Sequence, residues 1–116
     1  MKNLKSNGHV LTLTAPSGGV TAGVGYVIGN TFVVALQTAA VGEQFAGSVV
    51  GEFNLPKSTS DALTEGNAVY WDNTTKLVRA ASATGRYLIG TCTATQLAAD
   101  GYAYVRLNGV HVTAVP

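Results

Sequence analysis

The feature that most constrains this chain is a run of 37 residues, between Lys5 and Glu43, that contains no Asp, Glu, Lys or Arg. Glycine and proline interrupt the run, so it holds no apolar segment of the roughly 20 residues that a membrane-spanning helix needs. Soluble monomers usually carry charges on the exposed faces and edges of their sheets, where charge prevents pairing with other chains. We therefore expect this neutral segment to be covered by the rest of the domain, by identical subunits or by a larger partner.

The N-terminal residues lack the pattern of a secretory signal. Residues 1–5 are followed by the polar residues 6–9 and not by an apolar core with a small-residue cleavage site. We expect a protein that is made and used without export. The same polarity predicts a flexible N-terminal arm over residues 1–9, and the remaining length, 10–116, suits a single β domain.

Strand patterns predict an all-β fold, a small sandwich or barrel of about eight or nine strands. Val, Thr and Tyr are abundant, and turn residues recur about every ten residues. In residues 11–15 the apolar side chains occupy odd positions and threonine occupies even ones, so one face can enter a core. The predicted strands span residues 10–15, 25–28, 31–36, 43–55 with a bend near Gly51, 68–71, 77–80, 87–93 and 102–107, with a candidate ninth at 110–115.

Turn residues mark the connections. Residues 72–76 predict a hairpin loop, because Asp and Asn tolerate left-handed backbone and bond their own main chain. Asn108-Gly109 is a second, tighter hairpin candidate. One segment, 60–66, looks helical: Ser60 can cap a first turn and Gly66 can end it, which gives one short helical turn.

The groups that catalysis or ligand binding would need are scattered. Neither His9 nor His111 has a cysteine pair or acidic cluster at metal-ligand spacing, and the glycines at 18–29 lack the Lys and Ser/Thr of a phosphate-binding loop. Cys92 lies in a strand-like alternation and is expected to be a buried small hydrophobe. We therefore expect no catalytic residues, no cofactor, no metal and no enzyme activity.

Two further partner classes can be weighed from composition. A net charge of +1 provides no basic field to attract phosphates, so we expect no nucleic-acid partner. Tyr70 and Trp71 could form a stacking surface in a small ligand- or carbohydrate-binding β-sandwich. Core or interface packing explains these aromatic residues more simply, and the binding module stays as the alternative.

Five short segments carry a family resemblance, and in this order they span nearly the whole chain. They are LTLTAPSGGV at 11–20, GEFNLPK at 51–57, GNAVYWD at 66–72, LIG at 88–90 and VRLNG at 105–109. In these phrases the chain resembles the DUF2190 family of small tailed-phage proteins, which are similar to capsid cement (decoration) proteins.

The resemblance implies a structural, non-catalytic role. A protein of this kind is made in the host cytoplasm, resides on the capsid exterior of the virion, and stabilises contacts between major capsid subunits. Its expected partners are the major capsid protein and further copies of itself, with a homotrimer favoured and a dimer second. Residues 110–116 continue past the Leu-Asn-Gly at which relatives often end, so the contact made by this tail is left open.

Overall fold

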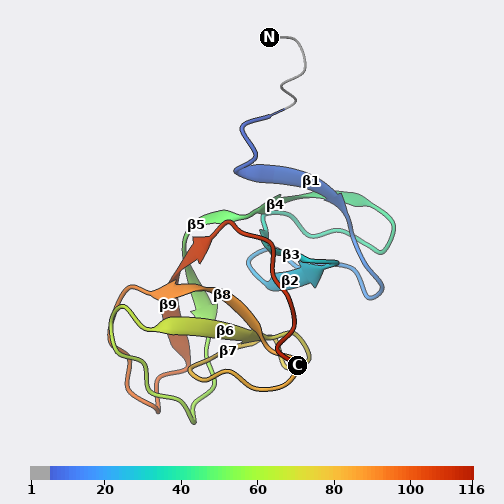
Figure 1. Cartoon of the computed structure of the whole chain (residues 1–116). Coiled ribbons are helices and arrows are strands. Elements are labelled where there is room, and N and C mark those ends of the chain that lie inside the picture. Colours follow the sequence, from blue (N-terminus) through green and yellow to red (C-terminus); the bar gives the residue numbers. More distant parts are fainter. Residues whose placement is uncertain (1–5) are drawn as a thin grey trace.

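The computed structural model describes residues 6–116, which form nine strands in two antiparallel sheets (Figure 1). The first sheet has the strand order β1-β4-β3-β2, and the second has the order β5-β9-β8-β6-β7. The strands are β1 Val10–Thr14, β2 Gly25–Ile28, β3 Thr31–Ala35, β4 Gln44–Ser48, β5 Val50–Pro56, β6 Ala68–Asp72, β7 Leu77–Arg79, β8 Tyr87–Cys92 and β9 Tyr102–Asn108. These sheets confirm the predicted all-β class.

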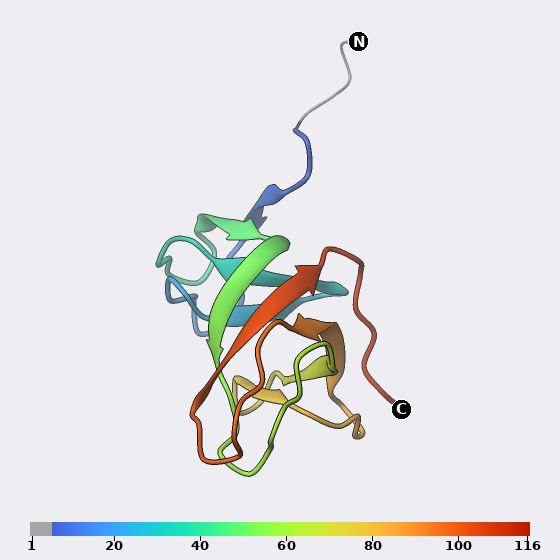
Figure 2. The same cartoon turned by 90° about the vertical axis from the view of Figure 1, so that its left-hand side faces the viewer.

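The chain passes from one sheet to the other between β4 and β5, where Figure 2 shows a long, curved green segment. The predicted strand 43–55 is divided here at Val49. Ser48 Oγ donates to the carbonyl of Val50 at 2.7 Å, and Gly51 has a φ of 120°, which favours glycine. The predicted bend near Gly51 thus corresponds to a change of sheets, which occurs two residues earlier, at Val49.

Strand β3 contributes to two hydrophobic cores. Phe32 and Val34 join the larger core, which lies on the second sheet, whereas Val33 and Ala35 join the smaller core of the first sheet. Alternate residues of a strand face opposite sides, so a strand buried on both faces reads as a continuous apolar run. Trp71 of β6 is fully buried and meets Phe32 edge-on at 5.3 Å between ring centroids, which joins the two sheets.

Gly90 allows β8 and β9 to approach closely in the second sheet. A Cβ atom at this position would lie 2.0 Å from the carbonyl oxygen of Arg106, a distance that no side chain tolerates. Glycine is therefore required where these two strands pair.

The helical turn predicted at 60–66 is wrong. Two turns flank an isolated bridge in which Leu63 and Gln96 exchange backbone hydrogen bonds of 3.0 and 2.9 Å. Leu63 is buried, and Gly66, with a φ of 91°, lies in a turn closed by the bond from Asn67 N–H to Thr64 C=O. Pairing with a segment distant in sequence uses the backbone groups that a helical turn would need.

The C-terminal segment also differs from its prediction. Gly109, at a φ of 70°, directs the chain away from β9, so Asn108-Gly109 is no hairpin and 110–115 is no strand. Val112 instead exchanges hydrogen bonds of 2.7 and 2.8 Å with Asn30, and Ala114 forms an isolated bridge with Tyr87. The red tail in Figure 2 thus connects the β2–β3 turn to the beginning of β8.

The predicted hairpin loop at 72–76 is confirmed. Strands β6 and β7 pair on either side of it, with Asp72 opposite Leu77. Asp72 Oδ1 accepts hydrogen bonds from the backbone N–H groups of Thr74 and Thr75 at 3.0 and 3.2 Å. Self-bonding of this kind is the reason that Asp favours such turns.

Candidate assembly surface

Strand β1 is the outer strand of the first sheet, with β4 as its one strand neighbour in the described part of the chain. Its side chains alternate between the exposed Val10, Thr12 and Thr14 and the half-buried Leu11 and Leu13. The two leucines pack against the smaller core. This arrangement follows the odd-even pattern of the sequence and leaves the threonines on the solvent face.

The backbone N–H and C=O groups of β1 alternate between pointing toward β4 and pointing toward the free edge. Ala15 N–H, directly after the strand, donates to Glu43 C=O at 2.8 Å. Bonded pairs recur at every second residue of an antiparallel ladder, so the odd-numbered residues of β1 bond to β4. The N–H and C=O groups of Val10, Thr12 and Thr14 consequently point away from the sheet, toward the free edge.

The solvent face beside this edge extends across β1 and β4 to Leu36, the residue after β3. Thr12 is opposite Ala46, and Leu36 N–H donates to the Ala46 carbonyl at 2.9 Å, which puts Leu36 next in the row. Val10 and Leu36 are each 46 % exposed. We call this surface the neutral face and define it as Val10, Thr12, Thr14, Leu36, Gln44 and Ala46.

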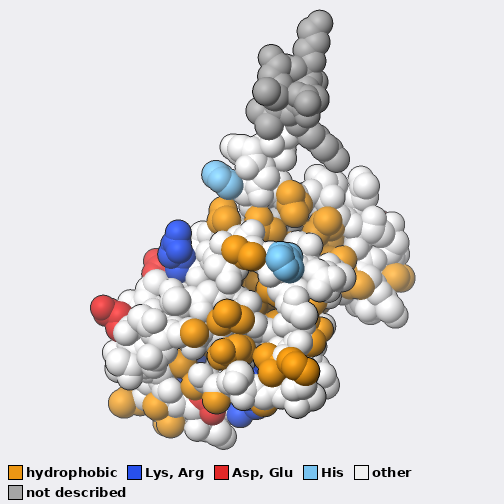
Figure 3. Space-filling model, viewed as in Figure 1, with side chains coloured by type: hydrophobic (Ala, Val, Ile, Leu, Met, Phe, Trp, Pro, Cys, Tyr) orange, Lys and Arg blue, Asp and Glu red, His pale blue; other side chains and the backbone are white. Residues whose placement is uncertain are grey.

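Charge is absent from all four strands of the first sheet. In Figure 3 the right-hand part of the surface, where these strands lie, shows no acidic or basic side chain in that view. The charged residue next to β4 is Glu43, whose Oε1 accepts a hydrogen bond from Ala40 N–H at 2.8 Å within its own loop. The neutral segment thus combines the buried strand β3 with an exposed face and edge at β1.

The other sheet edges carry features that block pairing. The edge strand β5 contains Glu52 and Pro56, and β7 is three residues long and ends in Arg79. On β2, Val27 N–H donates to Asn73 Oδ1 at 3.3 Å, so a side chain occupies part of that edge. Natural sheets use charge, proline, short strands and such covers to avoid edge-to-edge association. Within residues 6–116, β1 is the edge without this protection.

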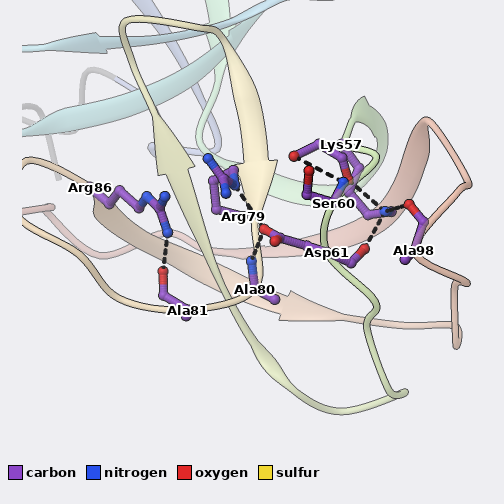
Figure 4. A network of polar contacts seen from close by, with 9 residues as sticks. Lys57, Ser60, Asp61, Arg79, Ala80, Ala81, Arg86 and Ala98 are labelled. Carbon is purple, nitrogen blue, oxygen red and sulfur yellow. Dashed lines mark hydrogen bonds and ion pairs between the residues drawn. The ribbon is translucent and has the colours of Figure 1, made fainter.

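The second sheet contains a buried charge instead. Lys57 is 2 % exposed, and its Nζ donates to the carbonyls of Ser58 at 2.7 Å, of Asp61, and of Ala98 at 3.1 Å (Figure 4). Burial of an ammonium group is tolerated when its donors are satisfied. Nothing in the sequence around Lys57 predicts this burial, because one of the three acceptors is 41 residues away.

Next to Lys57, Asp61 and Arg79 form the one ion pair among the described residues, with Arg79 Nε donating to Asp61 Oδ2 at 2.8 Å. The hydrogen bond from Arg79 holds the pKa of Asp61 below its usual value, against a smaller opposing effect of burial, and the Ala80 N–H adds to the lowering. The same contact raises the pKa of Arg79. Figure 4 shows this pair beside Lys57. These charged groups therefore bind partners within the part of the molecule built around the second sheet.

The residues considered from sequence as metal ligands or catalytic groups lie apart in the structure. His9 and His111 are exposed, and no group of three or more His, Cys, Asp or Glu residues that could hold a metal occurs within the described residues. Cys92 is buried as predicted, and its thiol donates to the Thr64 carbonyl at 2.9 Å. In the same part of the chain, no helix is long and apolar enough to cross a membrane.

The aromatic pair of the alternative hypothesis is divided between core and surface. Trp71 has no exposed area, and its indole Nε1 donates to Asn73 Oδ1 at 3.3 Å, whereas Tyr70 is half-buried. A buried indole offers no face to a sugar, so the geometry does not favour the carbohydrate-binding module. The exposed aromatic residues are Tyr102 and Tyr104, which meet edge-on at 5.6 Å on β9.

Comparison with known proteins identifies the family of this chain. The sequence model of a family described as phage cement protein matches residues 5–107, which is most of the chain and all nine strands up to the last residue of β9. No curated protein matches the chain. The tail after β9 lies outside the family match. With its two all-β sheets and an unprotected neutral edge in the first, this chain belongs to the phage cement protein family.

Proposed function

We propose that this protein binds the outer surface of a phage head and holds neighbouring major capsid subunits together. The observation that carries the proposal is the free edge of β1, where the backbone groups of Val10, Thr12 and Thr14 point outward beside a face without charge. Such an edge can accept a further strand from a partner, with main-chain hydrogen bonds providing affinity. The family supports a structural role in the phage particle.

The stabilising mechanism is linkage. A protein that binds the assembled shell but not the separated subunits shifts the equilibrium toward the shell by RT ln(1 + [L]/Kd) at each site. When each bound copy bridges two subunits, the stabilising free energies of the many copies on one head add together. A modest affinity per copy is then sufficient to strengthen the whole particle.

We further propose that the protein acts as an oligomer, with a homotrimer favoured and a dimer second. A shell presents local three-fold and two-fold positions, and simultaneous binding by linked copies raises avidity without new contacts. Sedimentation at micromolar concentration tests this proposal directly. A stable monomer would contradict preassembly, while assembly on the head itself would then appear as cooperative binding.

The edge is tested by Thr12→Pro, compared with the matched variant Thr12→Val. The Thr12 N–H points to the free edge, so proline removes a donor that the fold does not use and is tolerated there. Losing one or two intermolecular hydrogen bonds, each worth about 1 kcal/mol, predicts a drop in affinity of roughly tenfold. Thr12→Val retains the N–H group and should bind heads as the wild type does.

The measurement is co-sedimentation with heads that lack the protein, combined with thermal unfolding of each variant. Equal head occupancy by the wild type and by a folded Thr12→Pro variant would exclude β1 as the docking edge. Removal of residues 1–9 is a second test, because we propose that this segment forms an arm that adds to docking. Unchanged occupancy after that truncation would remove the arm from the proposal. The residues of the arm before Ser6 lie outside the described part of the chain.

A further inference from the structure

A hollow of about 350 Å³ lies between the Gly18–Gly19 loop, Tyr26 of β2 and the β6–β7 hairpin, which contributes Asn73 and Lys76. The loop follows β1 after three intervening residues, whereas Tyr26 lies on β2, at the other edge of the first sheet. It contains one charged side chain, Lys76, in surroundings that are otherwise neutral.

Asn73 is held in one orientation by three donors. Its Oδ1 accepts from Lys76 Nζ at 2.7 Å and from Val27 N–H and Trp71 Nε1 at 3.3 Å each. An amide oxygen has two lone pairs, so its acceptor capacity is used. These contacts assign the oxygen to the protein side, and the Nδ2 group, which has two N–H donors, makes no hydrogen bond to the described residues. The Tyr26 hydroxyl is also a donor toward a ligand, because its oxygen accepts from Thr21 N–H at 2.7 Å and it retains its own proton to donate.

Lys76 is placed here at a conformational cost. Its φ of 58° makes it the one non-glycine residue with left-handed backbone in the described chain. A residue in this region costs energy unless it is glycine, and such outliers gather at functional sites. The ammonium lies 4.9 Å from the centre of the Tyr26 ring, with no carboxylate partner among the described residues. Burial lowers the pKa of Lys76, and an incoming anion would offset this desolvation.

We propose that this hollow binds a carboxylate, an Asp or Glu side chain of the protein on which the molecule docks. A single positive charge beside Asn73 N–H donors matches one carboxylate in charge and hydrogen-bonding capacity. A doubly charged phosphate would retain an uncompensated negative charge in these neutral surroundings. The assignment rests on the proposed function, and it names the class of capsid side chain that this hollow selects.

The first experiment uses the isolated protein and does not depend on phage heads. ¹⁵N NMR follows the Asn73 side-chain amide and the Gly18 and Gly19 backbone amides during titration with N-acetylaspartate α-methylamide, which carries one carboxylate, at constant ionic strength. N-acetylasparagine α-methylamide, which has the same shape without the charge, is the control ligand. We expect saturable shifts with the acid alone. No saturable shift, or equal shifts with both ligands, would overturn the site.

The variant for both experiments is Lys76→Asn, because Asn is the non-glycine residue that best tolerates left-handed backbone and it removes the charge. Arg106→Gln, which removes one positive charge from an exposed position on β9, is the matched control. Lys76→Asn should abolish the shifts caused by N-acetylaspartate α-methylamide, and Arg106→Gln should preserve them. Thermal unfolding of each variant verifies that both are folded.

The second experiment is co-sedimentation with heads at low and high salt. Lys76→Asn should lower affinity about tenfold and remove the salt dependence that wild type and Arg106→Gln share. If wild type and Lys76→Asn bind equally, the carboxylate site is overturned while the cement function stands. If wild type fails to bind heads but still binds N-acetylaspartate α-methylamide, the proposed function and the capsid source of the carboxylate both fail.

Discussion

The two sheets of this protein divide charge and exposure between them. The first sheet has strands without a charged residue, a smaller core and an unprotected edge at β1. The second sheet has the larger core, the Asp61–Arg79 ion pair and the buried Lys57, and its edges carry charge and proline. The difference indicates that the second sheet provides most of the stability, which leaves the first free to present a surface suited to other proteins.

The largest expected effect compares the two cores directly. Trp71→Ala removes a fully buried indole from the larger core and should lower the free energy of unfolding by about 3–5 kcal/mol. Leu13→Ala removes a half-buried side chain from the first sheet and should cost about 1 kcal/mol. Urea unfolding monitored by circular dichroism measures both. A larger loss from Leu13→Ala would reverse the assignment of stability to the second sheet.

The next effect concerns the buried charge of the second sheet. Lys57→Met retains much of the side-chain volume but removes the donor shared by the Ser58, Asp61 and Ala98 carbonyls. Unsatisfied buried acceptors should lower the free energy of unfolding by about 2–3 kcal/mol. The control is Arg106→Met, at an exposed position, which should change it by less than about 0.5 kcal/mol. Equal unfolding curves for wild type and Lys57→Met would mean that Lys57 does not hold these loops.

The smallest effect is a response to acid that belongs to the second sheet. Asp61 has a lowered pKa in the folded state because Arg79 donates to it, so its contribution to stability is present above the unfolded pKa of about 4 and is lost as pH falls through the folded pKa. After allowance for solvent screening we expect a loss of about 1 kcal/mol. Asp61→Asn should flatten this acid limb in urea titrations between about pH 5 and pH 2.

Hydrogen exchange localises that response. Amides of the second sheet near Asp61 should lose protection first on acidification, and β3 of the first sheet should follow only with global unfolding. If protection in the first sheet declined equally early, the division of charge between the sheets would have no energetic consequence.

Local sequence patterns predicted most of the strands because alternation and turn chemistry act over a few residues. The odd-even pattern of residues 11–15 correctly predicted which side chains of β1 face the core. The turn preference of Asp72 correctly predicted the β6–β7 hairpin. The neutral stretch also predicted the candidate surface, because the absence of charge is visible without any knowledge of pairing. Which edge stays open was not predictable, since this depends on the order of strands in each sheet.

The features that the sequence did not predict involve partners distant along the chain. Leu63 is paired with Gln96, so the capping pattern at Ser60 and Gly66 did not lead to a helix. The tail at Val112 bonds to Asn30, 82 residues away, and does not extend β9. The hollow at Lys76 likewise requires the Gly18–Gly19 loop and the β6–β7 hairpin to meet.

The three carbonyls around the Lys57 ammonium form an arrangement that resembles a small cation site. Here the cation is covalently attached to the chain, so dilution does not dissociate it and chelators do not remove it. The loops that it joins consequently keep their geometry whatever the supply of free ions in the surrounding medium.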